Sequence, residues 1–313
     1  MAASDVSPAS MADAAPPAYP TLFQLNTRVY LTSLGRELGR LATLDDIPDA
    51  ELDRLAGLGF DWVWLLSVWR TGPASRAISL SDPALRAAFE ATLPDLTDDD
   101  IGGSGFAIAA YEVSPALGGD AALTRLRSRM AARGLRLMLD FVPNHMALDH
   151  PWASLHPERF VQGTEADLLR EPRNWTTVTT EGEGEFVLAH GRDPYFPGWT
   201  DTLQLDYGNP ATVEAMTAEL ASVAARCDGV RCDMAMLLLP DVFDRTWGHP
   251  ALPFWPEAIR RARAVHPGFV LMAEVYWDLE WTMLGDGFDL AYDKRLYDRL
   301  VASAAGPVRD HLR

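Results

Sequence analysis

The chain has 313 residues, enough for one large α/β domain of about 250 residues with a sizeable core. Its formal net charge of −17 argues against nucleic acids and anionic membrane surfaces as partners and favours neutral ligands. The two cysteines, Cys227 and Cys232, fall in segments predicted to be buried, so no disulfide framework is indicated.

The N-terminal residues 1–20 are rich in Ala, Pro, Ser and Asp. They lack the basic and apolar regions of a secretory signal, so we predict a disordered tail and a cytoplasmic protein. No apolar run approaches the ~20 residues that a membrane-spanning helix needs. The folded part is therefore expected to occupy residues 21–313.

Strand and helix patterns alternate in the first part of the chain. Residues 23–30 have strand composition, and residues 45–58 carry apolar positions at helical spacing that stop at Gly59. Residues 60–66 form a continuous apolar run, which is typical of a parallel strand covered on both faces. Residues 67–119 are polar and rich in Gly, which predicts a long loop with some local helix.

The alternation continues to the end of the chain. Helices are predicted at residues 120–133, 209–223, 255–265 and 294–304, and strands at residues 135–141, 229–232, 269–273 and 288–292. Residues 147–207 show no clean period, and their aromatic residues lie among Pro, Gly and acidic residues. Counting gives six β/α units, whereas a closed barrel of this type needs eight.

Three of the predicted strands deliver an acid at their C-terminal end: Asp140, Asp233 and Glu274. This is the edge at which a (β/α)₈ barrel carries its catalytic groups. Arg231 lies two residues before Asp233 on the same strand, so both side chains point the same way. A guanidinium at that position favours the ionised carboxylate. A lone Arg-x-Asp is often a structural ion pair, but three strand-end acids in order are more specific.

The residues around these acids carry a resemblance to a known family. The segments are Asp140-Phe-Val-Pro-Asn144-His145, Gly229-Val-Arg231-Cys-Asp233 and Ala273-Glu274-Val. They resemble the first three signature regions of the α-amylase family of retaining glycoside hydrolases, and the resemblance runs from about Thr21 to the last residue. It implies a TIM (β/α)₈-type barrel with a small domain B inserted after the third strand, at residues 147–207.

The family's fourth signature region, with its third catalytic carboxylate, does not follow within the 313 residues. We therefore expect a barrel with about six of its eight β/α units, truncated before that region. A form of this kind can be inactive by itself.

The resemblance also implies roles for two of the acids. Asp233 would be the nucleophile that forms a covalent glycosyl-enzyme, and Glu274 would be the acid/base. Retaining hydrolysis needs two carboxyl groups about 5–5.5 Å apart, which neighbouring strands about 4.8 Å apart can supply. The apolar strand before Glu274 should raise its pKa. The predicted activity is hydrolysis or transglycosylation of α-glucosides or oligosaccharides.

Four further side chains are predicted to bind the substrate: Phe106, Asp140, His145 and Arg231. Phe106 stands where the family usually has Tyr, so it keeps a stacking face and loses a hydroxyl. Ala110 stands where Asp is common. Residues 234–237 are apolar where starch-acting amylases often carry Lys-His, which favours an exo-acting hydrolase or a transglycosylase over an endo-acting amylase.

No cofactor and no metal site are predicted. In calcium-dependent amylases a region near the end of domain B offers an Asp ligand, and Gln204 stands at that place here. Calcium prefers several hard oxygen ligands with carboxylates among them. Asn144 remains, so calcium stays open as a ligand without being favoured.

Two other classes of function remain open. A barrel of this family can be a non-catalytic binding or scaffold subunit, although the presence of Asp233, Glu274 and Arg231 favours an enzyme. An unrelated metal-dependent barrel enzyme could use the same acids together with Asp140 and His145, but Arg231 would oppose a cation beside Asp233. The sequence does not indicate an oligomeric state.

Overall fold

The computed structural model describes residues 19–180, 182 and 184–313, so most of the tail predicted at residues 1–20 lies outside the described residues. Contacts divide the chain into two compact units. The described part of the first unit consists of residues 19–70, Glu112–Asp140 and Arg226–Gly229. The second unit consists of Thr71–Tyr111, Phe141–Ala225 and Val230–Arg313, except for residues 181 and 183.

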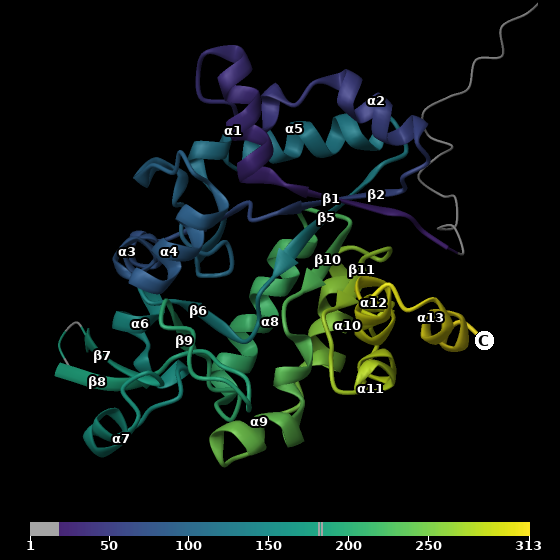
Figure 1. Ribbon diagram of the computed structural model, residues 1–313. Helices are drawn as coiled ribbons and strands as arrows, with labels where there is room; N and C mark the ends of the chain where they lie inside the picture. The colour runs from purple at the N-terminus through teal and green to yellow at the C-terminus, as the bar shows by residue number, and fades with distance from the viewer. Residues whose placement is uncertain (1–18, 181, 183) are drawn as a thin grey trace, which may run out of the picture. The chain divides into compact units, whose positions relative to one another are not determined.

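The first unit contains three neighbouring parallel strands. These strands are β1 (Leu22–Asn26), β2 (Trp62–Leu66) and β5 (Arg136–Phe141), the last of which ends in the second unit. Trp62 on β2 lies opposite Leu22 on one side and Arg136 on the other. The helices of this unit are α1 (Thr27–Leu38), α2 (Asp49–Gly57) and α5 (Gly119–Ala131), and Figure 1 shows them beside these strands.

The start of α1 differs from the sequence-based prediction. Residues 27–30 were expected to belong to the first strand, but the helix already begins at Thr27. The side chain of Asn26 accepts a hydrogen bond from the backbone N–H of Val29 at 3.3 Å, which makes Asn26 the N-cap of α1. The prediction of a strand up to Tyr30 is therefore wrong, because the cap ends the strand four residues earlier.

The second unit contains three further strands of the parallel set. They are β10 (Gly229–Cys232), which begins in the first unit, β11 (Val270–Ala273) and β12 (Leu290–Ala291). The backbone N–H of Glu274 donates to Cys232 O at 3.0 Å, and Met272 lies opposite Leu290 in a parallel pair. In this unit the N–H of Asp233 also donates to Phe141 O, at 2.8 Å.

The strand order is β1-β2-β5-β10-β11-β12, so the six strands predicted from the sequence are present in chain order. Helices α8 (Pro210–Ala224) and α10 (Trp255–Val265) connect consecutive strands and contact each other. Asn209 caps α8 through a hydrogen bond from the N–H of Ala211 at 2.9 Å, as expected for Asn before a helix that starts with Pro.

The remaining elements lie in the connections between these strands. Between β2 and β5 the chain forms β3 (Trp69–Thr71), α3 (Pro73–Ser81), α4 (Pro83–Thr92) and β4 (Ile108–Val113). Between β5 and α8 it forms β6 (His145–Ala147), α6 (Pro151–Leu155), α7 (Glu165–Arg170), β7 (Trp175–Thr180), β8 (Gly184–Ala189) and β9 (Thr202–Gln204). Short 3₁₀ turns lie at Leu44–Asp46, Asp98–Asp100, Pro115–Leu117, Pro157–Arg159 and Ala235–Leu238.

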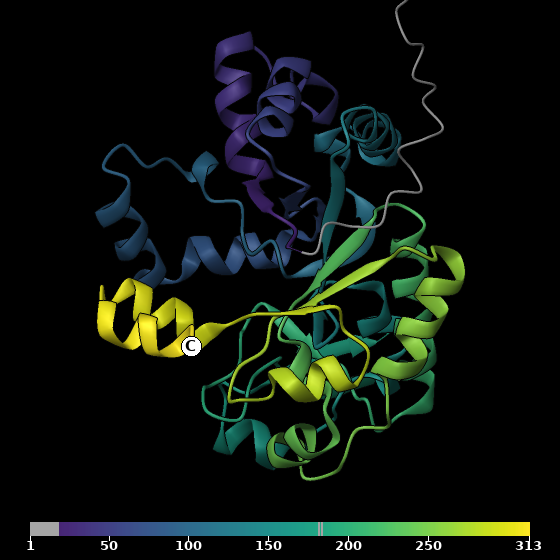
Figure 2. The same ribbon diagram turned by 90° about the vertical axis from the view of Figure 1, so that its right-hand side faces the viewer.

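The remaining helices follow β10. They are α9 (Pro240–Trp247), α11 (Glu280–Gly285), α12 (Lys294–Val301) and α13 (Ala305–His311). Figure 2 shows α12 and α13 in yellow next to each other. Across the described ranges, no helix has the length and apolar character required to cross a membrane.

Candidate active site

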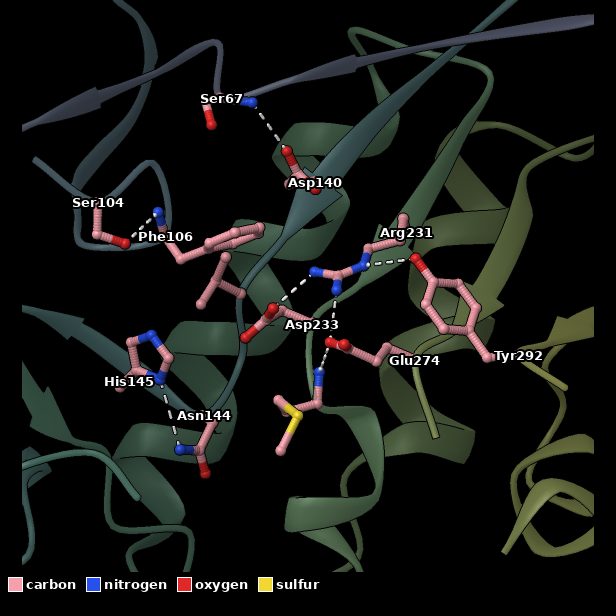
Figure 3. A network of polar contacts seen from close by, with 12 residues as sticks. Ser67, Ser104, Phe106, Asp140, Asn144, His145, Arg231, Asp233, Glu274 and Tyr292 are labelled. Carbon is pink, nitrogen blue, oxygen red and sulfur yellow. Dashed lines mark hydrogen bonds and ion pairs between the residues drawn. The ribbon is translucent and has the colours of Figure 1, made fainter. Parts of the chain in front are cut away.

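The end of β10 carries a buried ion pair. All four residues of the strand are buried, and Arg231 and Asp233 point to the same side of it, as the alternation predicted. Arg231 Nη1 lies 2.6 Å from Asp233 Oδ1, and the two residues are only 5% and 7% exposed. Figure 3 shows the guanidinium pointing toward the carboxylate. A charge-assisted hydrogen bond of this length stabilises negative charge on that oxygen.

The same guanidinium binds Glu274, the residue that follows β11. Arg231 Nη2 lies 2.5 Å from Glu274 Oε2, and Glu274 is 8% exposed. The planar fork of the arginine therefore holds one oxygen of each acid (Figure 3). The two acids that the sequence predicted as a catalytic pair are brought together by a single buried cation.

A strained turn completes the position of Glu274. Met234 has φ 45° and ψ 43°, in the left-handed region that residues other than Gly rarely adopt. This turn points the backbone N–H of Met234 at Glu274 Oε2, at 2.9 Å. Residues in such conformations cluster at functional sites, where the surrounding structure holds them.

The electrostatics of Glu274 suit an acid/base. Burial, followed by the negative charge of Asp233, raises the pKa of Glu274 above its ordinary value. Arg231, the hydroxyl of Tyr276 and the N–H of Met234 act in the opposite direction. A carboxyl group whose pKa is raised in this way holds a proton closer to neutral pH, as a general acid requires.

Two aromatic rings lie next to Arg231. Its guanidinium carbon is 5.2 Å from the centre of the Phe106 ring and 5.7 Å from the centre of the Tyr292 ring. Arg231 Nε also donates to the Tyr292 hydroxyl at 3.2 Å. Phe106, predicted as a substrate-binding aromatic, therefore lies in contact with the acid–arginine group, and Tyr292 adds a contact that the sequence analysis did not identify.

His145 lies in β6, with Asn144 immediately before it. Burial lowers the pKa of His145 to about 4, so the ring is neutral at pH 7. Its ring packs against Trp199 with a centroid distance of 5.2 Å, and the backbone of Phe106 is one of its hydrogen-bond partners. A neutral imidazole beside Phe106 can exchange hydrogen bonds with a sugar hydroxyl.

Asp140, the third strand-end acid, belongs to the first unit. Its carboxylate accepts hydrogen bonds from Trp64 Nε1 at 3.1 Å and from the backbone N–H of Ser67 at 3.0 Å. Trp69 Nε1 donates to the backbone oxygen of Asp140 at 2.7 Å. Donors of the first unit thus contact both the carboxylate and the backbone oxygen of Asp140, and substrate binding by Asp140 stays a prediction.

The residues around Gln204 do not fit a calcium ion. Gln204 Nε2 donates to Asn144 O at 2.9 Å, to Asn144 Oδ1 at 3.1 Å and to Leu205 O at 3.1 Å. Asn144 Nδ2 returns a hydrogen bond to Gln204 Oε1 at 3.0 Å. The oxygens that a hard cation would need are thus already paired with amide hydrogens, and no carboxylate is among them. Nor do the described residues contain any group of three or more His, Cys, Asp or Glu side chains arranged to hold a metal ion.

Three groups in this site were not predicted from the sequence. The Tyr276 hydroxyl and the backbone N–H of Met234 contact Glu274, and the Tyr292 hydroxyl contacts Arg231. Tyr276 lies two residues after Glu274, and the spacing that paired Arg231 with Asp233 could have indicated it. Nothing in the sequence indicates the turn at Met234, because a left-handed conformation is not expected of Met.

Strands and helices that alternate in this order, with buried acids following neighbouring strands, define a class of α/β-barrel enzymes. Comparison with known proteins specifies which one. The model of the alpha-amylase catalytic domain matches residues 24–283, so the chain belongs to the α-amylase family, whose fold is the TIM barrel and whose members are glycoside hydrolases and related transferases.

Curated relatives are distant in sequence. The chain is 27% identical over 250 residues to an alpha-glucosidase of Culex pipiens, a match that covers 74% of this chain and 37% of the relative. It is 25% identical over 298 residues to an alpha-1,4-glucan:maltose-1-phosphate maltosyltransferase of Burkholderia pseudomallei, covering 90% of this chain and 22% of the relative.

Solved structures support the same fold. An alpha-amylase from Lactobacillus plantarum superposes with a TM-score of 0.61 at 23% identity, covering 90% of this chain and 54% of that structure. A maltogenic alpha-amylase from Thermotoga neapolitana gives 0.58 at 20% identity, covering 94% and 55%. The chain thus spans about half the length of these structures, and less of the curated relatives.

Proposed function

We propose that this chain carries the nucleophile and the acid/base of a retaining enzyme that hydrolyses or transfers α-glucosyl groups. One observation carries the proposal: the buried Arg231 guanidinium holds an oxygen of Asp233 and an oxygen of Glu274 at the ends of neighbouring strands. Two curated relatives are described as an alpha-glucosidase and a maltosyltransferase. The proposal therefore includes both hydrolysis and transfer.

The proposed reaction has two steps, formation and breakdown of a covalent glycosyl-enzyme. In the first, Asp233 attacks the anomeric carbon, the glycosidic C–O bond breaks, and the proton of Glu274 passes to the departing oxygen. In the second, water or an acceptor hydroxyl gives its proton to Glu274 and attacks the same carbon, which releases Asp233. Arg231 stabilises the negative charge of Asp233 before attack and after release.

Two side chains near the acids support a proposal for the substrate class. Phe106 offers an aromatic face and His145 a neutral ring that can bind a sugar hydroxyl. We therefore propose an α-glucoside or an oligosaccharide as the substrate. The proposed compartment is the cytoplasm.

The test is covalent trapping in the natural full-length protein. A slow fluorinated α-glucosyl donor should accumulate on Asp233, and peptide mapping of the labelled protein locates the adduct. Asp233→Asn should abolish labelling, whereas Asp241→Asn, on the exposed N-terminal turn of α9, should label like the parent protein. Label on another residue of an active protein would overturn the assignment, and oligosaccharide binding without label or turnover would favour a binding subunit.

A further inference from the structure

We propose that Tyr276 is a positioning residue that aligns Oε1, the oxygen of Glu274 that carries its acid proton. The inference rests on the proposed function, since it concerns the proton that Glu274 delivers to the leaving oxygen. It comes from the contacts of the two carboxyl oxygens, which differ in chemical kind.

The two groups that donate hydrogen bonds to Oε2 cannot accept a hydrogen bond in return. Arg231 Nη2 lies 2.5 Å from Oε2, and the backbone N–H of Met234 donates to it at 2.9 Å. A guanidinium and a backbone amide N–H have no lone pair to offer in return. A proton on Oε2 would therefore face two N–H groups, so the protonated form of Glu274 must carry its proton on Oε1.

The group that contacts Oε1 can both donate and accept a hydrogen bond. The Tyr276 hydroxyl lies 2.5 Å from Oε1. A phenol can donate to the ionised carboxylate and, after a rotation about its C–O bond, accept from the protonated acid. Burial, followed by the contact with Glu274, raises the pKa of the Tyr276 hydroxyl, so the phenol keeps its own proton at neutral pH.

A turn after Tyr276 fixes its position. Trp277 and Asp278 have φ values of 63° and 64°, two consecutive left-handed residues that are not Gly. The N–H of Leu279 donates to Tyr276 O at 3.3 Å, and Asp278 forms an ion pair with Arg295 on α12. Strain of this kind is kept when the surrounding structure requires the geometry.

The charged and titratable groups that face Glu274 are Arg231 on β10, Asp233 directly after this strand, and Tyr276 on the loop that follows Glu274. Tyr292 contacts Arg231. Arg231 and Asp233 act on both oxygens through their charge. Tyr276 acts on Oε1 alone. Its hydroxyl therefore aligns the oxygen that gives the proton to the glycosidic oxygen in the first step and takes one from the acceptor in the second.

The test is Tyr276→Phe in the full-length protein, with kcat/KM for an aryl α-glucoside measured against pH. The hydroxyl donates to ionised Glu274, so its removal should raise the pKa of the acid and move the alkaline limb of the profile up by about one pH unit. Tyr297→Phe, on the exposed face of α12, is the matched control and should leave the profile in place. An unmoved limb in Tyr276→Phe would overturn the proposal.

A second readout does not need turnover. The side-chain carboxyl of Glu274 can be titrated by NMR in carboxyl-labelled protein, with Glu274→Gln used to assign its signal. The Glu274 pKa should rise in Tyr276→Phe and stay constant in Tyr297→Phe. If the parent protein is active and Glu274 titrates alike in the parent and in Tyr276→Phe, the role of Tyr276 alone is refuted. The absence of trapping at Asp233 would instead refute the proposed function.

Discussion

Replacing Arg231 by Met should destabilise the protein strongly, because the change leaves two buried carboxylates without their cation. Arg231 is 5% exposed and binds Asp233 at 2.6 Å and Glu274 at 2.5 Å. Removing one partner of a buried ion pair typically costs about 3–5 kcal/mol. Whole-domain stability is only about 5–15 kcal/mol, so this one change should remove a large fraction of it.

The free energy of unfolding is measured by urea titration at pH 7 and at pH 5. Arg231 lowers the pKa of Glu274, which burial raises, so the pKa should rise further in Arg231→Met. A group whose pKa is raised in the folded state contributes stability at low pH and loses it as the pH rises through that pKa. The deficit of the variant should therefore be smaller at pH 5 than at pH 7.

Two further variants test the reasoning. The triple variant Arg231→Met, Asp233→Asn, Glu274→Gln removes the uncompensated charges and should recover much of the stability. Arg260→Met on α10 removes an exposed arginine and should change the free energy of unfolding by less than about 0.5 kcal/mol. If Arg231→Met unfolds like Arg260→Met, or if the triple variant remains as unstable as the single one, the ion-pair argument is refuted.

Two other predictions concern Glu274 and Gln204. Glu274→Gln should lose about 10²–10⁴ in rate on α-glucosides with poor leaving groups and much less on activated aryl α-glucosides, and an equal loss on both would contradict the acid role. Chelators should leave the melting temperature unchanged, because the side-chain amide of Gln204 already donates hydrogen bonds to the oxygens of Asn144 and Leu205 around it. Gln204→Asp should melt several degrees lower and respond to added calcium; a melting temperature of the parent protein that falls with chelator and returns with calcium would contradict this account.

The six strands were predictable because the parallel sheet requires continuous apolar runs, and those runs are visible in the sequence. Helices α2, α5, α8, α10 and α12 were predicted from their apolar spacing, whereas α1, α9 and α11 were not. Helix α10 has the predicted bounds, Trp255–Val265. The error at residues 27–30 arose because strand composition continued past Asn26, and composition does not show which side chain will cap a helix.

Within the candidate site, the period of two along a strand was enough to place Arg231 beside Asp233. It was not enough for the contacts that cross between segments. The N–H of Met234 reaches Glu274 only through a left-handed turn, and Tyr292, the residue after β12, contacts Arg231. Such contacts depend on how strands and loops pack in three dimensions, which a single sequence does not encode locally.

The amide of Gln204 has a consequence for the conditions under which His145 stays in place. A metal ion bound between two segments stabilises the folded protein by an amount that depends on the free concentration of the metal. Dilution, citrate or phosphate therefore reduces this stabilisation. Gln204 is covalently part of the chain and lies opposite His145 in the β6–β9 pair, so its bonds to Asn144 have no free ligand to lose. The position of His145 should therefore be independent of the ionic composition of the medium.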